Sequence, residues 1–301
     1  MYDLIVVGGG PAGLTASIYA IRKRLNVLLV SKDLGGKTNF NLQIPWVQEY
    51  QVIRGKEIIS KFINELEYLD FTRCMEKVEK IEKTKDGFLV KTAEGSKMEA
   101  RAVIIASGTQ QQWLDVPGER KYLSKGLCYS ALSYAPLFID KVTAVIGDGD
   151  LALRSAAELA LVAEHVYVVG PDDAALDSPL GGKLKESKNV TILNEYHVKE
   201  VRGNGFANQL VVESPAGKIE NINADGSFVE KKLIPNTGFA AGLVELDPEG
   251  QIVVDKYNRT SQPGIFAAGD VTDSVSEQVL VAIGEGAKAA LRAYEYLLPY
   301  L

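Results

Sequence analysis

The chain has 301 residues, of which 46% are hydrophobic and 24% charged, enough for two domains of ordinary size with cores of their own. A formal net charge of −6 argues against a general nucleic-acid binder, which needs a basic face. Two cysteines and two histidines give no disulfide framework and no spaced set of metal ligands. The sequence shows no signal peptide and no apolar run of about 18 residues, so it predicts a cytoplasmic protein that does not enter a membrane.

The N-terminal segment predicts a dinucleotide-binding unit. An apolar run over residues 4–7 is typical of a buried parallel strand. Gly8, Gly10 and Gly13 follow in G-x-G-x-x-G spacing, and after them come a helical stretch, LTASIYAIRK, and a second apolar strand, NVLLV. In this order the glycines allow a tight turn, the approach of a pyrophosphate, and close packing of helix on strand. The N–H groups and dipole at the start of the helix attract the phosphates.

The same unit occurs a second time. In VTAVIGDGDLALRSAAELALVAEHVYVVG, residues 142–170, Gly147 and Gly149 take the first two glycine positions and Ala152 the third. Gly147 lies 139 positions after Gly8, and the strand that follows each helix ends with the same offset. Stretches rich in β-forming residues follow both copies; the first has turn signals at positions 86–87 and 94–95. The sequence therefore predicts two nucleotide-binding modules, each with a β-meander.

A third informative stretch lies near the C-terminus. GIFAAGDV, residues 264–271, reads as a short apolar strand that ends at Asp270, and a long helix is predicted to start near Gln278.

Together these segments resemble the low-molecular-weight thioredoxin reductase family of flavoproteins with two dinucleotide-binding domains. The resemblance is carried by the two glycine motifs, by IIASGT at 104–109 and by GIFAAGDV. It implies an α/β fold with two Rossmann-like domains. An FAD domain would be formed by 1–112 and 240–301, with a pyridine-nucleotide domain, 113–239, inserted between them. It also implies a homodimer, by analogy alone.

The resemblance also implies which residues bind the cofactor. Asp270 would bind the ribitol of FAD, and the chain near Gln278 would bring the positive end of the last helix to the flavin pyrimidine. That end would stabilise the negative charge that reduced flavin carries at N1/O2. The residues expected to bind FAD are Gly8, Gly10, Pro11, Ala12, Gly13, Ser31, Lys32, Gly35, Gly36, Lys37, Ala106, Ser107, Gly108, Gly269, Asp270, Glu277, Gln278 and Val279. The residues expected at a second nucleotide site are Gly147, Gly149, Asp150, Leu151, Ala152 and Gly170.

The first departure from the family is the missing redox dithiol. Ser130 and Ser133 stand where the family has a Cys-x-x-Cys pair, and serine has no accessible thiol–disulfide cycle. No catalytic residue is therefore assigned, and reduction of a disulfide by this chain alone is not expected. Cys128, two positions upstream of Ser130, is either a single thiol able to form a mixed disulfide or a small buried apolar residue.

The second departure concerns the pyridine nucleotide. NADPH-dependent members carry arginines for the 2′-phosphate after the second strand of the inserted domain, whereas here Gly170 is followed by Pro171, Asp172 and Asp173. These carboxylates would repel a phosphate, and Asp148 adds negative charge near the pyrophosphate site. NADPH is therefore not expected. NADH, FAD or another adenine dinucleotide would still fit the retained turn, and a domain that binds no nucleotide is the alternative.

The third departure lies around the flavin. Gly35 and Gly36 match the family, but Lys37 replaces a glutamine and Trp46 an asparagine. Ser31 stands where a carboxylate usually takes the adenine ribose, and its neutral hydroxyl is a weaker acceptor. Trp46 is expected either to stack near the isoalloxazine or to pack in a core.

These departures leave three hypotheses of function. The first is an FAD-dependent oxidoreductase that receives electrons from a protein donor such as ferredoxin, or from a second bound dinucleotide. The second is an enzyme like ferredoxin/flavodoxin reductases, which also lack the dithiol but keep the arginines. The third is a non-catalytic protein that senses flavin or nucleotide. Because the FAD motifs are nearly intact while both electron relays are lost, the sequence favours the first.

Overall fold

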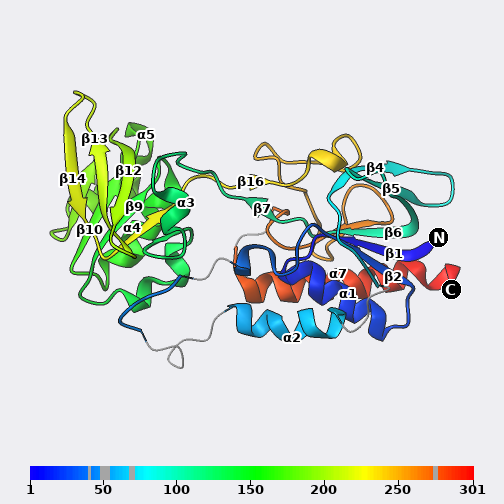
Figure 1. Ribbon diagram of the computed structural model, residues 1–301. Coiled ribbons are helices and arrows are strands. Elements are labelled where there is room, and N and C mark those ends of the chain that lie inside the picture. The colour runs from blue at the N-terminus through cyan, green and yellow to red at the C-terminus, as the bar shows by residue number, and fades with distance from the viewer. Residues whose placement is uncertain (40–41, 48–54, 68–71, 274–276) are drawn as a thin grey trace. The chain divides into compact units, whose positions relative to one another are not determined.

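The computed structural model describes residues 1–39, 42–47, 55–67, 72–273 and 277–301 (Figure 1). The chain folds into two compact units. The first comprises Met1–Asn39, Ile53–Gln110 and Ile234–Leu301, and the second Phe40–Val52 and Gln111–Leu233. The first unit is therefore built from both ends of the chain.

A parallel sheet forms the centre of the first unit. Its strands lie in the order β3, β2, β1, β6, β17, and all adjacent pairs are parallel. The bounds are β1 Tyr2–Val7, β2 Val27–Val30, β3 Arg73–Cys74, β6 Lys97–Ile105 and β17 Ile265–Ala267. Every second residue of β1 faces the same side, so Leu4 and Val6 join one buried cluster while Ile5 and Val7 join another. Both faces of the sheet are thus covered, which explains why its strands read as unbroken apolar runs.

The β-meander of the first unit shares a strand with this sheet. β4 (Val78–Lys83) and β5 (Phe88–Thr92) pair antiparallel, and β5 continues onto the first half of β6. The second half of β6 lies between β1 and β17. The two predicted turns are present: Thr84 N–H donates to Gly87 O (2.9 Å) and Gly95 N–H to Thr92 O (3.1 Å).

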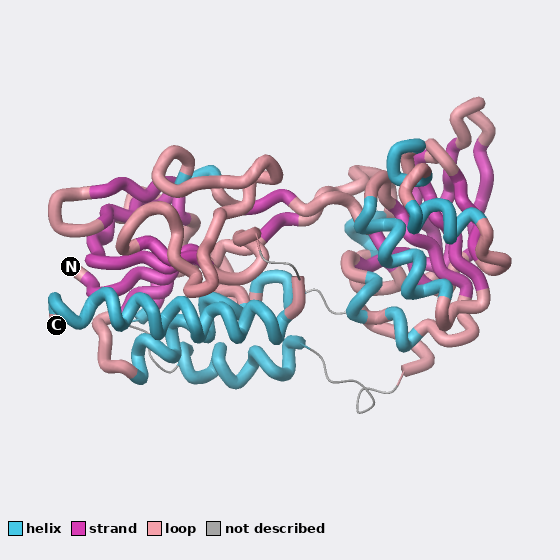
Figure 2. Tube along the Cα trace, turned by 180° about the vertical axis from the view of Figure 1, so that it is seen from behind, coloured by secondary structure: helices cyan, strands magenta, loops and turns pink. Residues whose placement is uncertain are grey.

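Three helices cover one face of the first unit's sheet, as Figure 2 shows. They are α1 (Pro11–Arg22), α2 (Gly55–Glu67) and α7 (Val279–Leu297). α1 and α7 meet closely enough that a Cβ on Gly286 would lie 2.1 Å from the Ala12 carbonyl oxygen. This contact holds the start of α1 and the C-terminal helix together. The predicted start of the last helix is confirmed, since Gln278 is the N-cap of α7.

The second unit repeats the plan of the first. Its parallel sheet has the order β11, β10, β9, β15, β8, with bounds Val190–Leu193, His165–Val169, Val142–Ile146, Gly226–Val229 and Leu127–Cys128. An antiparallel sheet of β12 (His197–Gly203), β13 (Ala207–Glu213) and β14 (Ile219–Asn223) accompanies it. α4 (Asp150–Ala160) begins 139 positions after α1, the same offset as between the glycine motifs. The predicted α/β class, with two Rossmann-like units that each carry a β-meander, is confirmed.

Shorter elements complete the described chain. They are η1 Gly36–Asn39, β7 Thr109–Gln110, α3 Glu119–Tyr122, η4 Ala131–Ser133, η5 Ala135–Leu137, α5 Asp173–Leu176, α6 Pro179–Lys185, β16 Ile234–Pro235, η6 Gly238–Ala240 and η7 Leu298–Tyr300. β7 and β16 form a two-stranded antiparallel ribbon within the first unit.

Trp46 belongs to the core of the second unit, although the predicted FAD domain, 1–112, included it. Its indole Nε1 donates to the Leu137 carbonyl oxygen (3.0 Å), and its ring packs edge-on against Phe138, with centroids 5.5 Å apart. A large aromatic ring buries its area wherever apolar partners enclose it, so the packing alternative describes this residue. Whether the predicted domain boundaries match the binding of nucleotides stays a prediction.

Candidate nucleotide-binding sites

Neighbouring backbone leaves no room for a side chain at two glycines of the first glycine turn. Gly8 has φ +111°, and a Cβ there would lie 2.2 Å from the Ala106 carbonyl oxygen. A Cβ on Gly13 would lie 1.8 Å from the Gly8 carbonyl oxygen. No side chain can be placed at these two positions without moving the strand or the helix. At Gly10, by contrast, a Cβ would meet nothing within 4 Å.

The start of α1 fits a pyrophosphate. Gly10 is the N-cap and has no side chain to cap the helix, Pro11 and Ala12 open the first turn, and that turn contains no acidic residue. The first N–H groups of an α-helix have no acceptor within the helix, and they carry the positive end of the dipole. A phosphate group can therefore approach over Gly10 and accept these N–H groups. This open, uncapped terminus is the feature by which the first unit fits FAD.

The loop after β2 folds back onto the glycine turn. Ser31 Oγ accepts the Gly9 N–H (2.8 Å) and donates to the Asp33 carbonyl oxygen (2.7 Å), while Gly35 N–H donates to Gly9 O (2.7 Å). The Ser31 proton is thus committed within the loop, which leaves only a lone pair of the hydroxyl for a ribose. Lys32 is exposed.

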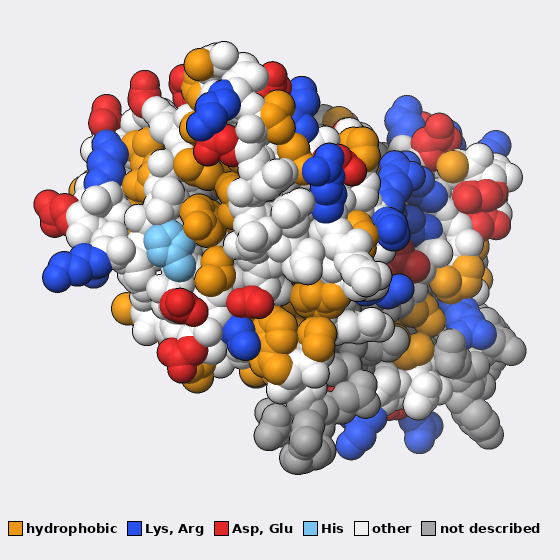
Figure 3. Space-filling model, turned by 60° about the vertical axis from the view of Figure 1, so that its left-hand side comes forward, with side chains coloured by type: hydrophobic (Ala, Val, Ile, Leu, Met, Phe, Trp, Pro, Cys, Tyr) orange, Lys and Arg blue, Asp and Glu red, His pale blue; other side chains and the backbone are white. Residues whose placement is uncertain are grey.

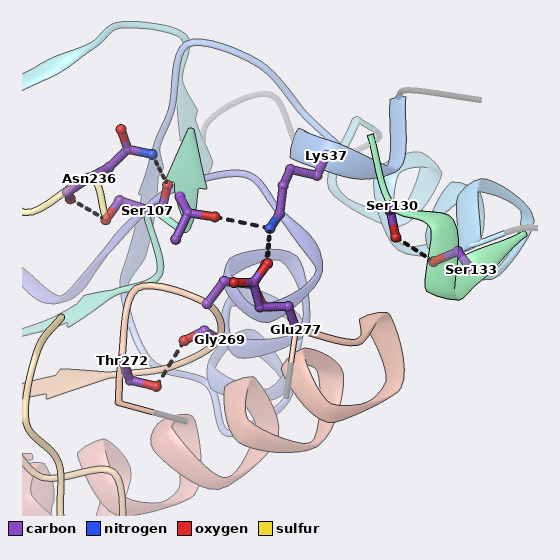
Figure 4. Close-up of polar contacts among 10 residues, drawn as sticks. Lys37, Ser107, Ser130, Ser133, Asn236, Gly269, Thr272 and Glu277 are labelled. Carbon is purple, nitrogen blue, oxygen red and sulfur yellow. Dashed lines mark hydrogen bonds and ion pairs between the residues drawn. The ribbon is translucent and has the colours of Figure 1, made fainter. Parts of the chain in front are cut away.

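Lys37 and Asp270 meet in an ion pair. The Lys37 ammonium lies 2.6 Å from Asp270 Oδ2. It also lies 3.1 Å from Oε2 of Glu277 (Figure 4). Burial disfavours the charged form of Lys37, but the two carboxylates outweigh this effect and raise its pKa above the ordinary value. Gly36, one residue before Lys37, has φ +54°, and a Cβ there would come within 3.2 Å of Gly10 Cα. The predicted ribitol ligand therefore carries a cation as its neighbour.

The end of β6 is fixed by Asn236, which the sequence analysis did not name as a site residue. Ser107 Oγ donates to the Asn236 carbonyl oxygen (2.7 Å), and Asn236 Nδ2 donates to the Ser107 carbonyl oxygen (3.0 Å; Figure 4). Asn236 N–H also donates to Gly108 O (2.9 Å). The predicted residues 106–108 are thereby held in one conformation. The signal was the position of Asn236 between a proline and a threonine, which marks a turn.

The loop after β17 is closed by its own hydrogen bonds. Gly269, with φ +77°, donates its N–H to Glu285 Oε2 of α7 (2.7 Å), and its carbonyl oxygen accepts from Thr272 Oγ1 (2.9 Å). These contacts fix the backbone next to Asp270 and tie this loop to α7.

The second glycine turn has the same backbone plan. A Cβ on Gly147 would lie 2.2 Å from the Glu230 carbonyl oxygen and 2.9 Å from the Ala152 Cβ, whereas a Cβ on Gly149 would meet nothing within 4 Å. Gly149 is the N-cap of α4 and provides no side-chain cap. Packing therefore explains glycine at 147 but not at 149.

The charge around the second turn differs from that of the first. Asp150 opens α4, ahead of Leu151, and both Asp148 and Asp150 are exposed. After β10, Gly170 turns the chain with φ +86°, and Asp172 then caps α5 through a hydrogen bond from Ala175 N–H to Oδ1 (2.7 Å). An aspartate in the first turn satisfies the helix dipole and leaves less attraction for a phosphate.

The serine pair keeps the spacing of a redox pair without its chemistry. Ser130 Oγ and Ser133 Oγ lie 2.9 Å apart in a hydrogen bond (Figure 4). Ser130 has φ 110°, so the segment turns at this residue instead of continuing as a strand. The buried carboxylate of Glu230 accepts the N–H groups of Ser130 (3.1 Å) and Ala131 and thereby fixes this turn.

Cys128 is a buried thiol. Its exposed fraction is 1%, and burial, with a smaller contribution from the charge of Glu230, raises its pKa to about 12. Thiol nucleophiles react as thiolates, so this residue has the character of a small apolar side chain. The mixed-disulfide alternative has no support from this geometry.

The described residues contain no group of three or more His, Cys, Asp and Glu that could hold a metal ion. No helix in the described part of the chain is long and apolar enough to cross a membrane. On the face shown in Figure 3, basic and acidic side chains lie side by side with hydrophobic ones between them.

Similarity to known proteins agrees with this architecture. The family model described as pyridine nucleotide-disulphide oxidoreductase matches residues 2–286. Among solved structures, a crystal structure of thioredoxin reductase from Streptococcus pyogenes MGAS5005 superposes with a TM-score of 0.89 at 34% sequence identity, covering 99% of this chain and 98% of that one.

Two curated relatives are similar over 99% of the chain. A protein named NADH dehydrogenase from Bacillus subtilis (strain 168) is 34% identical over 301 residues. A protein named as a subunit of alkyl hydroperoxide reductase, from Staphylococcus aureus (strain MRSA252), is 35% identical over 300 residues. The chain spans 59% of the length of each.

Proposed function

The chain belongs to the pyridine nucleotide-disulphide oxidoreductase family, which binds FAD, and from this premise we propose an FAD-dependent oxidoreductase that neither reduces disulfides by itself nor uses NADPH. The observation that carries the proposal is the hydrogen-bonded pair of Ser130 and Ser133, at the place of the family's dithiol. FAD would supply two-electron transfer, while a pair of hydroxyls cannot pass electrons to a disulfide.

The first unit is proposed to bind the FAD. Gly8 and Gly13 shape the turn, the open position at Gly10 admits the pyrophosphate, and Asp270 and Gln278 take the ribitol and the pyrimidine. The uncapped start of α1, with no acidic side chain in its first turn, supports the pyrophosphate assignment.

The electrons are proposed to come from a protein donor such as ferredoxin, or from a second adenine dinucleotide in the second unit. Gly149 supports the second source, because nothing in the protein packs where its side chain would lie. Asp172 and Asp173 oppose a 2′-phosphate there, which leaves NADH or a second FAD. One relative is named NADH dehydrogenase, so NADH is the nucleotide to test first.

The test is to measure bound flavin and donor dependence together. Protein purified from cells should release FAD, identified by mass and counted per chain. Reduction of the bound flavin is then followed with NADPH, NADH and reduced ferredoxin. We expect NADPH to be ineffective; prompt flavin reduction at micromolar NADPH would refute that part of the proposal.

The disulfide part has its own test. Thioredoxin and a small disulfide such as DTNB are offered as acceptors with each donor, and no turnover is expected. The double variant Ser130→Cys/Ser133→Cys should instead form an intramolecular disulfide under oxidising conditions. Disulfide reduction by the natural chain that persists in Cys128→Ser would contradict the proposal.

We also propose that the protein acts as a cytoplasmic homodimer, on the basis of the family resemblance. Light scattering at micromolar concentration should give twice the mass of one chain.

A further inference from the structure

The Lys37 ammonium joins three segments of the first unit that are far apart in sequence. Its Nζ lies 2.6 Å from Asp270 Oδ2 and 3.0 Å from Thr109 Oγ1. It also lies 3.1 Å from Oε2 of Glu277, which is labelled in Figure 4. Lys37 itself lies in η1, Thr109 in β7, and the two acids in the chain that runs from β17 to α7. An ammonium group has three N–H donors, and each finds one of these oxygens. We call Lys37, Asp270, Glu277 and Thr109 the Lys37 cluster.

The Lys37 cluster is more than an ordinary surface ion pair. Exposed pairs contribute little because water screens them. The Asp270 side chain is only 14% exposed and that of Lys37 30%, while Glu277, 39% exposed, is the more strongly screened partner. Two carboxylates share a single cation, so removal of the ammonium would leave two negative charges close together. The pKa of Lys37 is raised accordingly, which keeps the ammonium charged throughout the physiological range.

The Lys37 cluster lies next to residues that are proposed to bind FAD. Asp270 is the predicted ribitol ligand, Gln278 next to Glu277 is the N-cap of α7, and Gly36 next to Lys37 approaches Gly10 at the start of α1. The cluster therefore lies among the segments proposed to hold FAD. Reduction by two electrons with uptake of one proton adds one negative charge to the flavin, and carboxylates nearby would oppose that charge.

We propose that Lys37 is a positioning residue that offsets part of the negative charge of Asp270 and Glu277 in the flavin site and thereby favours binding of reduced over oxidised FAD. The inference rests on the proposed function, because it requires FAD in the first unit. It goes beyond that function by naming one cation and its two carboxylate partners as groups that shift the reduction potential of the flavin. Lys37 does this by holding Asp270 in place for the ribitol and by cancelling part of the negative charge around it.

The experiment measures the flavin potential and the FAD affinity of purified holoprotein. Lys37→Gln should lower the ratio of affinities for reduced and oxidised FAD about tenfold, a potential about 30 mV more negative for a two-electron couple. Glu277→Gln, which removes one of the two carboxylates, should move the potential in the opposite direction. Lys85→Gln is the matched control, since Lys85 is exposed in the turn between β4 and β5, and its potential should equal that of the natural protein.

The outcomes separate this inference from the proposed function. If Lys37→Gln retains FAD at the potential of Lys85→Gln, the inference is wrong while the proposed function stands, even if the variant is less stable to heat. If the natural protein takes up no FAD after reconstitution, the proposed function fails and the inference with it. Should Lys37→Gln not fold, two other variants decide. Lys37→Arg retains the positive charge and should keep the potential of the natural protein. An unchanged potential in Glu277→Gln overturns the inference.

Discussion

The first and second glycine turns both lead into a helix whose N-cap, Gly10 or Gly149, provides no side-chain cap. In both turns a Cβ at the first glycine would collide with a neighbouring backbone oxygen, while a Cβ at the second would lie in open space. The first position is thus required by packing, and the second is free of it. The open space at Gly10 is where FAD is proposed to bind, and whether a nucleotide uses the same space at Gly149 stays a prediction.

The charges of the two turns differ. α1 begins with Pro11 and has no acidic residue in its first turn, whereas α4 begins with Asp150. The loop after β2 brings Lys37 to the first site, where Asp270 and Glu277 take up its charge, and the loop after β10 leads into α5, which Asp172 caps. One backbone plan therefore offers an attractive place for a pyrophosphate in the first unit and a weaker one in the second. From this difference in charge we expect that the glycine motif alone does not set the affinity for a nucleotide.

The largest effect is expected from adding a charged side chain at the open glycine of each turn. The backbone at Gly10 (φ −74°) and at Gly149 (φ −123°) suits any residue, so both glutamate variants should fold. Gly10→Glu places a carboxylate where the pyrophosphate is proposed to bind, and FAD affinity should fall at least a hundredfold, about 2.7 kcal/mol. Gly149→Glu should leave that FAD in place.

Flavin per chain, counted after extraction, measures both variants. If the second unit also binds FAD, Gly149→Glu should remove one of two equivalents. Retention of full flavin by Gly10→Glu would break the assignment of FAD to the first turn.

A smaller effect is expected from giving the second unit the positive charge it lacks. Asp173 lies at the start of α5, exposed, and accepts a hydrogen bond from Asn194 (2.8 Å). Asp173→Arg removes a carboxylate and supplies a donor for a 2′-phosphate. One charge-assisted hydrogen bond contributes roughly 1.5–3 kcal/mol, and an unfavourable cation at the start of a helix offsets part of this gain. NADPH binding should therefore improve about tenfold. NADH affinity should change little.

Calorimetric titration with both nucleotides measures this difference. Asp177→Arg is the control, because Asp177 lies at the other end of α5 with its side chain 83% exposed and the charge change is the same. An equal increase in affinity for NADH and NADPH in Asp173→Arg would show that the new side chain does not contact the 2′-phosphate.

The sequence predicted the parts of the fold that depend on neighbouring residues. Both glycine turns, the strands around them, the hairpin turns near Gly87 and Gly95 and the start of α7 follow from apolar periodicity and from glycine. These signals are local, because the residues that predict a strand or a turn lie within the same short stretch of sequence.

The side-chain partners could not be predicted in the same way. Lys37 and Glu277 are 240 positions apart, and Ser107 and Asn236 129. Only the folded sheets bring these pairs together, and a single sequence carries no periodic signal for them. The same limit applies to Glu230, whose buried carboxylate fixes the turn at Ser130. Lys37 was recognised as a departure from the family, but its two carboxylate partners were not.

The smallest effect distinguishes the thiols of the two units. Cys74 of the first unit is partly exposed, and Cys128 of the second is buried. The pKa of Cys128 is raised to about 12, mainly by burial, so almost no thiolate forms at pH 8. The pKa of Cys74 is also raised, by burial and by Glu76 and Glu94, but its position lets a reagent reach it. N-ethylmaleimide should therefore add once to the native protein at pH 8 and twice after unfolding.

The pH dependence of this reaction gives a second measurement. Because the folded-state pKa of Cys128 exceeds that of a free thiol, its contribution to the free energy of unfolding is complete below about pH 8.5 and is lost as the pH rises toward about 12. Labelling of Cys128 should accelerate over that range, and Cys74→Ser should show no adduct in the native state at pH 8. Mass spectrometry of timed samples records both. Equal rates for the two thiols in the native protein would mean that Cys128 is accessible and reactive, and the loss of thiol chemistry from the second unit would then be incomplete.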